Sequence, residues 1–177
     1  MRSVSIAGTG TTAFGELDAG VKELGIKAVS RALRSCDVRR DDVDALYLGN
    51  FVAGALEGQE AIAPLVADSV GLTGIPATKT EGACASSGIA FREAYQSIRT
   101  GVHDVVVATG VESMTNAGTA EFTRALGSAA DQGTEGETGL TFPGFYGLLL
   151  DRYMHEYGAT REQVAAVSVK NRRNGVS

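Results

Sequence analysis

The seven residues from Asp104 to Gly110 restrict the fold of this 177-residue chain more than any other stretch. The four residues after Asp104 are apolar, with no polar residue between them. A strand of this composition is apolar on both faces, so both faces must be covered by other elements. Parallel sheets between two layers of helices provide such cover. The run therefore predicts an α/β protein with a mostly parallel sheet.

Three further segments have the composition of strands, and three have the periodicity of helices. The strands are expected at 4–8, 45–49 and 76–81, and the helices at 21–33, 62–70 and 89–101. In the first helix, apolar residues recur at the i, i+3, i+4 spacing that gives a helix one apolar face. Strands that alternate with helices in this way predict a layered α/β fold with four strands.

The composition changes after the last expected strand. Residues 115–140 are rich in glycine, threonine and acidic side chains, which predicts a long irregular loop. A helix is expected from Tyr146 to Tyr157, and the capping box from Thr160 to Gln163 predicts the start of another. We therefore divide the chain into an α/β core over 1–114 and a loop or cap region over 115–177.

The charge and the cysteine content exclude several classes of protein. A net charge of −5 without a run of basic residues argues against nucleic-acid binding. No window approaches the roughly 20 apolar residues of a membrane span, and the N-terminus lacks the pattern of a signal peptide. Two cysteines far apart in the sequence indicate a reduced, cytoplasmic protein. The cysteines and histidines also lack the spacing of a metal site, so no bound metal is expected.

Residues 8–13 match the glycine pattern of a dinucleotide-binding loop, but the surrounding sequence argues against that function. The helix should begin inside the pattern, whereas Phe14, Gly15 and Gly20 precede any helical periodicity. The acidic residue expected about 20 positions further on, after a second strand, is also missing. We interpret this segment as a flexible loop.

Cys84 lies at a turn between an extended segment and a helix. Small residues surround it in the sequence, namely Ala83, Ala85, Ser86, Ser87 and Gly88. The first turn of a helix carries unpaired N–H groups and the positive end of the helix dipole, which favour a reactive thiolate. The arrangement resembles a nucleophile elbow, with the cysteine sulfur in place of the serine oxygen. Cys84 is therefore the candidate catalytic residue, and we interpret Cys36 as an ordinary packing residue.

Three motifs resemble those of one enzyme family. They are Ala83-Cys84-Ala85-Ser86 with Gly88, Gly110-Val111-Glu112-Ser113-Met114, and the junction from Tyr157 to Gln163. In this order the motifs resemble the thiolases, most closely the archaeal and sterol-carrier-protein-type branch of the acetyl-CoA acetyltransferases. The resemblance extends over essentially all 177 residues. It implies a layered, thiolase-like N-terminal half with an attached helical loop region.

The resemblance implies roles for Cys84 and for two aromatic residues. Cys84 would be the nucleophile that takes the acyl group from a coenzyme A thioester. Acyl-CoA is then a substrate, and no resident cofactor is implied. Phe145 and Tyr146 fall where the family places residues near the pantetheine arm of coenzyme A. The family reaction interconverts two acetyl-CoA with acetoacetyl-CoA and CoA, or cleaves a longer 3-ketoacyl-CoA.

The chain departs from the family after this N-terminal portion. Thiolases contain a second, similar half, in which a Gly-His-Pro histidine and a Gly-Cys-Gly cysteine activate the substrates and complete the oxyanion holes. Neither motif is present in the sequence, and nor is the final strand of the first half. Loss of one oxyanion donor costs about 100- to 1000-fold in rate. The isolated chain is therefore expected to be inactive, and acyltransferase activity is expected of the complete assembly.

The residues leave two alternatives open. One is another enzyme of the thiolase superfamily, such as a ketoacyl synthase, a hydroxymethylglutaryl-CoA synthase or a retro-aldolase. Cys84 argues against the retro-aldolases, and the stretch from Gly110 to Met114 argues against the ketoacyl synthases. The other is a half-thiolase without catalytic function, which binds acyl groups or supports an assembly. By resemblance, the expected partners are further copies of the chain, a complementary C-terminal-half chain, or a small zinc-bearing OB-fold protein.

Overall fold

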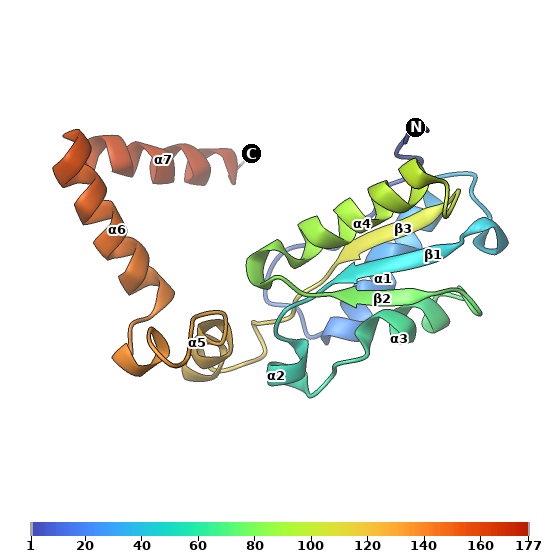
Figure 1. Ribbon diagram of the computed structural model, residues 1–177, viewed down its shortest axis with the longest axis horizontal. Helices are drawn as coiled ribbons and strands as arrows, with labels where there is room; N and C mark the ends of the chain where they lie inside the picture. The colour runs from blue at the N-terminus through green and yellow to red at the C-terminus, as the bar shows by residue number, and fades with distance from the viewer. Residues whose placement is uncertain (1, 177) are drawn as a thin grey trace. The chain divides into compact units, whose positions relative to one another are not determined.

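The computed structural model describes residues 2–176, and the chain divides into two compact units after Leu126 (Figure 1). The first unit contains α1 (Val21–Arg34), η1 (Arg40–Asp42), β1 (Ala45–Gly49), α2 (Ala53–Glu57), α3 (Ile62–Ser69), β2 (Ala77–Thr80), η2 (Ala83–Ala85), α4 (Ser86–Thr100) and β3 (Val106–Gly110), and α5 (Thr119–Gly127) crosses the boundary. The second unit contains η3 (Gly136–Thr138), α6 (Phe142–Tyr157) and α7 (Arg161–Asn174). The predicted division of the chain after residue 114 stays a prediction.

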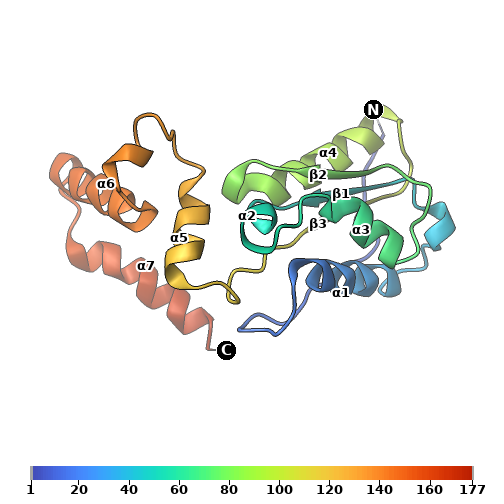
Figure 2. The same ribbon diagram turned by 90° about the horizontal axis from the view of Figure 1, so that it is seen from below.

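The sheet of the first unit has three parallel strands in the order β2–β1–β3. Leu46 of β1 pairs with Ala77 on one side and with Val107 on the other. Helix α4 packs on one face of the sheet, and α1 and α3 lie on the other face, as Figure 2 shows. This arrangement of helix, sheet and helices confirms the predicted layered α/β fold.

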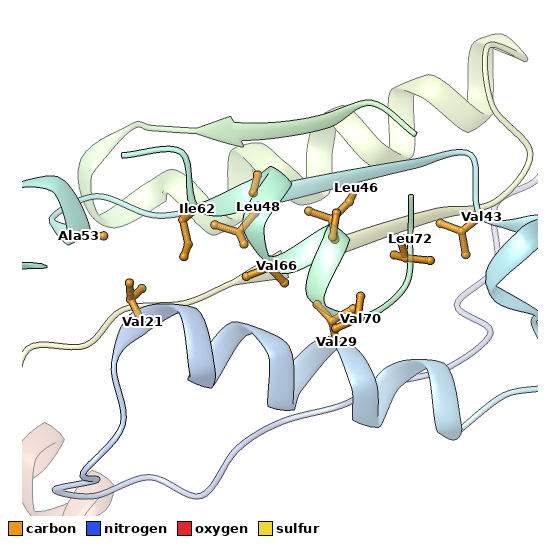
Figure 3. Packing of buried hydrophobic residues seen from close by; sticks show 12 residues of the cluster. Val21, Val29, Val43, Leu46, Leu48, Ala53, Ile62, Val66, Val70 and Leu72 are labelled. Atoms are coloured by element: carbon orange, nitrogen blue, oxygen red, sulfur yellow. The ribbon is translucent and has the colours of Figure 1, made fainter. Parts of the chain in front are cut away.

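The hydrophobic core lies between the sheet and the helices α1 and α3 (Figure 3). Leu46 and Leu48 point from β1 toward these helices, because alternate residues of a strand face the same side. Both leucines and Val66 of α3 are fully buried. Burial of one such side chain contributes about 2 kcal/mol. Gly25 lets α1 approach closely, because a Cβ at this position would lie 2.9 Å from Val66 Cγ2.

The segment at 4–8, which we expected to be a strand, is not one in the structure. The residues after it pack against α1 instead, and the Thr9 N–H donates to Ser35 Oγ at 2.8 Å. A Cβ on Gly10 would lie 2.4 Å from the carbonyl oxygen of Ala28, so glycine is needed for this approach. The expectation of four strands is therefore wrong for residues 2–176, because this part of the chain packs against the C-terminal end of α1 rather than beside a strand.

Strand β3 lies at the edge of the sheet, although its apolar sequence predicts cover on both faces. Its residues are half-buried or exposed, whereas all residues of β1 except Tyr47 are buried. The side chain of Val107 is only partly covered by the core. Helices lie on both faces of β3, α4 on one and α1 on the other, but its residues are less buried than predicted because no described strand covers its outer edge.

The outer edge of β3 carries unpaired backbone groups. The carbonyl of Val105 and the N–H of Val111 both bond toward the side of β1. In a parallel ladder, alternate residues direct their N–H and C=O groups to the same neighbour. The backbone groups of Val106, Ala108 and Gly110 therefore point away from β1. Within residues 2–176, no strand pairs with them.

Helix α5 lies within residues 115–140, where we expected an irregular loop. Its first turn forms when Glu121 and Phe122 both donate backbone N–H groups to the carbonyl of Gly118, at 2.9 and 3.0 Å. Ala125 on this helix is buried. The glycine-rich composition of the whole stretch concealed these nine helical residues, so the prediction is wrong for α5.

Helix α7 begins at its predicted capping box, whereas α6 begins at Phe142 rather than at the predicted Tyr146, because a threonine cap and a proline in the first turn start it earlier. The Thr141 side chain accepts from the Gly144 N–H to cap α6, and Pro143 lies in the first turn. Thr160 and Gln163 form the predicted capping box of α7, with the Thr160 N–H donating to Gln163 Oε1 at 2.9 Å. No described residue of either helix is buried. These helices therefore owe their bounds to local signals rather than to a core.

Candidate active site

Cys84 lies between β2 and α4, beyond the carboxyl ends of the strands. Strand β2 ends at Thr80, η2 contains Cys84, and α4 begins at Ser86. The cysteine is exposed. The structure thus places Cys84 in the strand–turn–helix arrangement that the sequence predicts. Functional sites of parallel sheets gather at this end of the strands.

Ala83, the residue before Cys84, has a left-handed backbone conformation with φ of +48°. No other non-glycine residue between 2 and 176 has a positive φ. The conformation costs about 1–2 kcal/mol for a residue that carries a Cβ. It makes the turn between β2 and α4 sharp, as a nucleophile elbow requires. Sequence reasoning missed this feature, because alanine is not a residue type that indicates a left-handed turn.

Ser86 holds the turn together from inside the protein. Its side chain is buried, with 4% exposure. Its Oγ accepts from the Gly82 N–H at 3.0 Å and donates to the Ala83 carbonyl at 2.6 Å. Thr80 Oγ1 donates to the carbonyl of Ser86 at 3.0 Å. Because each such bond contributes about 1 kcal/mol, the two bonds of the hydroxyl offset the strain at Ala83.

Two glycines form the floor beneath this turn. A Cβ on Gly49, at the end of β1, would lie 2.4 Å from the backbone nitrogen of Ser87. A Cβ on Gly110, at the end of β3, would lie 1.8 Å from Ser87 Oγ. The first turn of α4 can therefore rest directly on the strand ends only because both positions are glycine. The signal in the sequence is a glycine at the end of each apolar strand.

Glu112 and Asn50 join the ends of β3 and β1. A carboxylate oxygen of Glu112 accepts from the Phe51 N–H at 2.9 Å and the other from Asn50 Nδ2 at 2.8 Å. Asn50 is 1% exposed, and its Nδ2 also donates to the Val111 carbonyl at 2.9 Å. Glu112 belongs to the motif from Gly110 to Met114, so part of that motif fixes the strand ends beside the cysteine turn. Sequence reasoning did not single out Asn50.

A cavity of about 420 Å³ lies between α1, the residues 10–19 and the residues 108–115. It runs beside β3, and Ala108, Thr109 and Gly110 of that strand are among its lining residues. Cys84 is not one of its lining residues. The cavity therefore marks space next to the open sheet edge rather than a substrate pocket at the cysteine.

Phe145 and Tyr146, the predicted substrate-binding residues, lie in the first half of α6. Their ring centroids are 5.7 Å apart in an edge-to-face arrangement. The two side chains are 39% and 64% exposed. They belong to the second unit, whereas Cys84 belongs to the first. Their contact with a substrate held at Cys84 stays a prediction.

The remaining cysteine and the histidines lie apart from Cys84 in the sequence. Cys36 is half-buried, and its Sγ lies 3.6 Å from the carbonyl oxygen of Ala32. His103 has a buried Nδ1 without a hydrogen-bond partner, and His155 is exposed on α6. Among residues 2–176, no group of three or more potential ligands could hold a metal ion. No helix in the same range is long and apolar enough to cross a bilayer.

The fold and the site define a layered α/β protein with an exposed cysteine at a strand–turn–helix elbow. The sequence profile described as the thiolase N-terminal domain matches residues 4–177. The chain therefore belongs to the thiolase family, which confirms the resemblance seen in its motifs.

Curated relatives agree with this assignment. The chain is 44% identical to an acetyl-CoA acetyltransferase of Methanothermobacter thermautotrophicus over 98% of its length, and 42% identical to one of Methanocaldococcus jannaschii over 96%. It is 34% identical to a benzoylsuccinyl-CoA thiolase subunit of Thauera aromatica over 99% of its length. It covers 45%, 43% and 44% of these relatives, so it spans less than half of each.

Solved structures share the fold. The Ltp2–ChsH2(DUF35) aldolase superposes with a TM-score of 0.60 at 25% identity, over 88% of this chain and 38% of that one. The Acat5 thiolase of Ascaris suum, solved in complex with coenzyme A, superposes with a TM-score of 0.54 at 21% identity. That match covers 63% of this chain and 29% of the other, and it supports the fold alone.

Proposed function

We propose that Cys84 is the nucleophile of an acetyl-CoA acetyltransferase of the thiolase type. Its Sγ attacks the thioester carbonyl carbon, a new C–S bond forms to the cysteine, and the bond to the sulfur of coenzyme A breaks. The departing CoA thiolate takes up a proton. The observation that supports this step most is the exposed position of Cys84 in the turn that leads into α4.

The chain supplies only part of the catalytic machinery in this proposal. Condensation of two acetyl units needs a base for the α-proton and further donors for the oxyanion. The sequence lacks the Gly-His-Pro and Gly-Cys-Gly motifs that carry these groups in thiolases. A complementary C-terminal-half sequence therefore completes the site. The whole assembly then makes acetoacetyl-CoA or cleaves a 3-ketoacyl-CoA, with Phe145 and Tyr146 beside the pantetheine arm.

The proposed assembly includes partner chains in the cytoplasm. The Thauera relative is named as a subunit, and one structural neighbour is a complex that contains a DUF35 chain. Both names support a partner chain, either a further copy of this chain or a different protein. By family resemblance, the different protein is a small zinc-bearing OB-fold chain.

Acetylation of Cys84 tests the proposed function directly. The complete assembly, in which this chain is joined by the complementary C-terminal half, is incubated with acetyl-CoA, and peptide mass spectrometry locates the acetyl group. We expect an acetyl thioester on Cys84 in the wild type and none in Cys84→Ala. Cys36→Ala is the matched control, since it removes the other thiol and leaves the turn intact. Acetylation confined to Cys36, or full activity of the complete assembly with Cys84→Ala, would reject the proposal.

One alternative has specific support in the comparisons. The structural neighbour with the TM-score of 0.60 is an aldolase, and a retro-aldol cleavage breaks a C–C bond without an acyl-enzyme. Cys84 is not needed for such a reaction. Complete assemblies that cleave an aldol substrate equally well with Cys84→Ala would favour the aldolase function over the acetyltransferase function.

A further inference from the structure

We propose that Ser86 is the positioning residue for Cys84, an inference that rests on the proposed function of the cysteine. Ser86 is one of four buried polar residues described in the structure, the others being Asn50, Ser97 and Ser113. It lies two positions after Cys84, at the first residue of α4. A buried hydroxyl at this point of the chain needs partners, and it finds them around the turn.

The hydroxyl of Ser86 bridges Gly82 and Ala83, the two residues before Cys84. It accepts from the Gly82 N–H at 3.0 Å and donates to the Ala83 carbonyl at 2.6 Å. The φ bond of Ala83 lies between these two groups, so the two hydrogen bonds restrain the direction of the chain there. The Ser86 carbonyl is also held, because it accepts from Thr80 Oγ1 at 3.0 Å. The serine thus fixes the chain on the N-terminal side of the cysteine.

The left-handed conformation of Ala83 gives this hydroxyl a specific task. With φ at +48°, Ala83 occupies a region that residues with a Cβ avoid. Without the Ser86 hydroxyl, the turn keeps only the bond from the Ala83 N–H to Glu81 Oε1 and the bond from the Ala85 N–H to the Gly82 carbonyl, and neither holds the Ala83 carbonyl, so we expect Ala83 to relax toward an ordinary φ. Such a change rotates the chain at Cys84 and moves its sulfur away from the first turn of α4. Displacement of a reacting group by about 1 Å can lower a rate by about 100-fold.

If Ser86 only stabilised the fold, loss of another buried serine hydroxyl from α4 would change the reactivity of Cys84 to the same extent. The same helix offers such a control. Ser97 is also buried on α4, at 8% exposure, and its Oγ donates to the Ala94 carbonyl at 2.9 Å. It lies at the other end of the helix. Ser97→Ala therefore removes a buried serine hydroxyl from α4 without touching the turn.

The test compares the reactivity of two thiols in one molecule. The rate of iodoacetamide alkylation is measured for Cys84 and for Cys36 by peptide mass spectrometry, and their ratio is formed. We expect Ser86→Ala to lower the ratio by about 10-fold, through loss of the thiol from the helix start. We expect Ser97→Ala to change it by less than about 2-fold. An unchanged ratio in Ser86→Ala, or an equal fall in Ser97→Ala, overturns the proposal.

Rescue by glycine separates positioning from general stability. Glycine adopts a positive φ without strain, so Ala83→Gly should restore the ratio in the Ser86→Ala background to within about 3-fold of the wild type. A folded double variant with a low ratio overturns the proposal. If Ser86→Ala alone does not fold, the alkylation ratio of the double variant is compared with that of the wild type, with the same limit of about 3-fold.

The same variants separate this inference from the proposed function. Alkylation does not require acyl chemistry, so it reports the reactivity of the thiol in its surroundings independently of the proposed acyl transfer. Equal acetylation of Cys84 by acetyl-CoA in the wild type and in Ser86→Ala keeps the acetyltransferase function and rejects the role of Ser86. No acetylation of the wild type, together with a ratio that depends on Ser86, rejects the function and keeps Ser86 as the residue that positions the thiol.

Discussion

The two units of the chain follow the same local rules but differ in what they bury. The first contains the whole hydrophobic cluster, whose members lie between Val21 and Leu72. In the second, α6 leaves its large apolar residues exposed, namely Phe145, Tyr146, Leu148, Leu149, Leu150, Tyr153 and Tyr157. A left-handed glycine ends α4 in the first unit and α6 in the second, at Gly101 and Gly158, but only the first unit adds a core. The difference shows that local signals fix the bounds of α6 and α7, while their tertiary stability must come from contacts outside these helices.

Truncation of one leucine in each unit should give the largest contrast. Leu46→Ala removes a fully buried side chain and should lower the free energy of unfolding by about 3 kcal/mol. Leu149→Ala on α6 removes a side chain that is 48% exposed, and should cost less than about 0.5 kcal/mol. Urea unfolding followed by circular dichroism measures both. Equal losses would show that α6 is packed as firmly as the core.

Addition of one methyl group to a glycine should have opposite effects in the two units. Gly49→Ala forces a Cβ to within 2.4 Å of the Ser87 nitrogen, and should cost about 2 kcal/mol and reduce the reactivity of Cys84. Gly147 lies within α6, and a Cβ there meets no atom within 4 Å. Gly147→Ala should therefore stabilise the protein by about 0.5 kcal/mol. A neutral Gly49→Ala would mean that the first turn of α4 can move.

Neutralising one glutamate in each unit should give a smaller contrast. Glu112→Gln places an amide where the Phe51 N–H needs an acceptor, and should cost about 1.5 kcal/mol. Glu156→Gln on α6 weakens an exposed ion pair with Arg152, and should cost about 0.3 kcal/mol. Thermal unfolding of both variants measures the difference. A larger loss for Glu156→Gln would assign a more important role to the surface of α6 than its exposure suggests.

The smallest expected effect concerns acid. Backbone N–H groups of Val105 and Asp104 lower the pKa of the Asp44 carboxyl, and the backbone of Glu162 together with Thr160 lowers that of Glu162. A lowered folded-state pKa contributes stability that is present above the unfolded pKa and is lost as pH falls through the folded pKa. Asp44→Asn and Glu162→Gln should each reduce the loss of stability between about pH 5 and about pH 2.

The urea midpoints of the wild type and both variants at the two pH values check this prediction. If only Asp44→Asn, and not Glu162→Gln, altered the acid dependence of the urea midpoint, only the first unit would contribute to the measured unfolding. A steeper acid dependence in Asp44→Asn than in the wild type would contradict the assigned sign.

The sequence predicts those parts of the fold that depend on neighbours along the chain. Strand β1 has the predicted bounds of 45–49, and the apolar stripe of α1 ends within one residue of its predicted limit. The capping box at Thr160 forms as predicted. The cysteine turn also lies where the small residues around Cys84 indicate, because its strand–turn–helix order is local.

The features that sequence reasoning missed depend on residues far apart in the chain. Residues 4–8 have the composition of a strand but pair with no strand, and this cannot be read from composition. Asn50 looked unremarkable, yet its partner Glu112 is 62 positions away. Gly49 gains its importance from Ser87, which packs on it from another element. Contacts of this kind are determined by the tertiary fold, so the pattern of a single segment does not predict them.

The unpaired edge of β3 has a consequence during synthesis of the protein. Three backbone positions with free hydrogen-bonding groups, on a strand without charged residues, form a template that can accept a strand from any chain. Charges that would block such pairing stand outside the strand, at Asp104 and Glu112. Each new molecule therefore exposes this edge to neighbouring copies for as long as no other segment or chain covers it. An edge that stays open favours intermolecular β-pairing and aggregation.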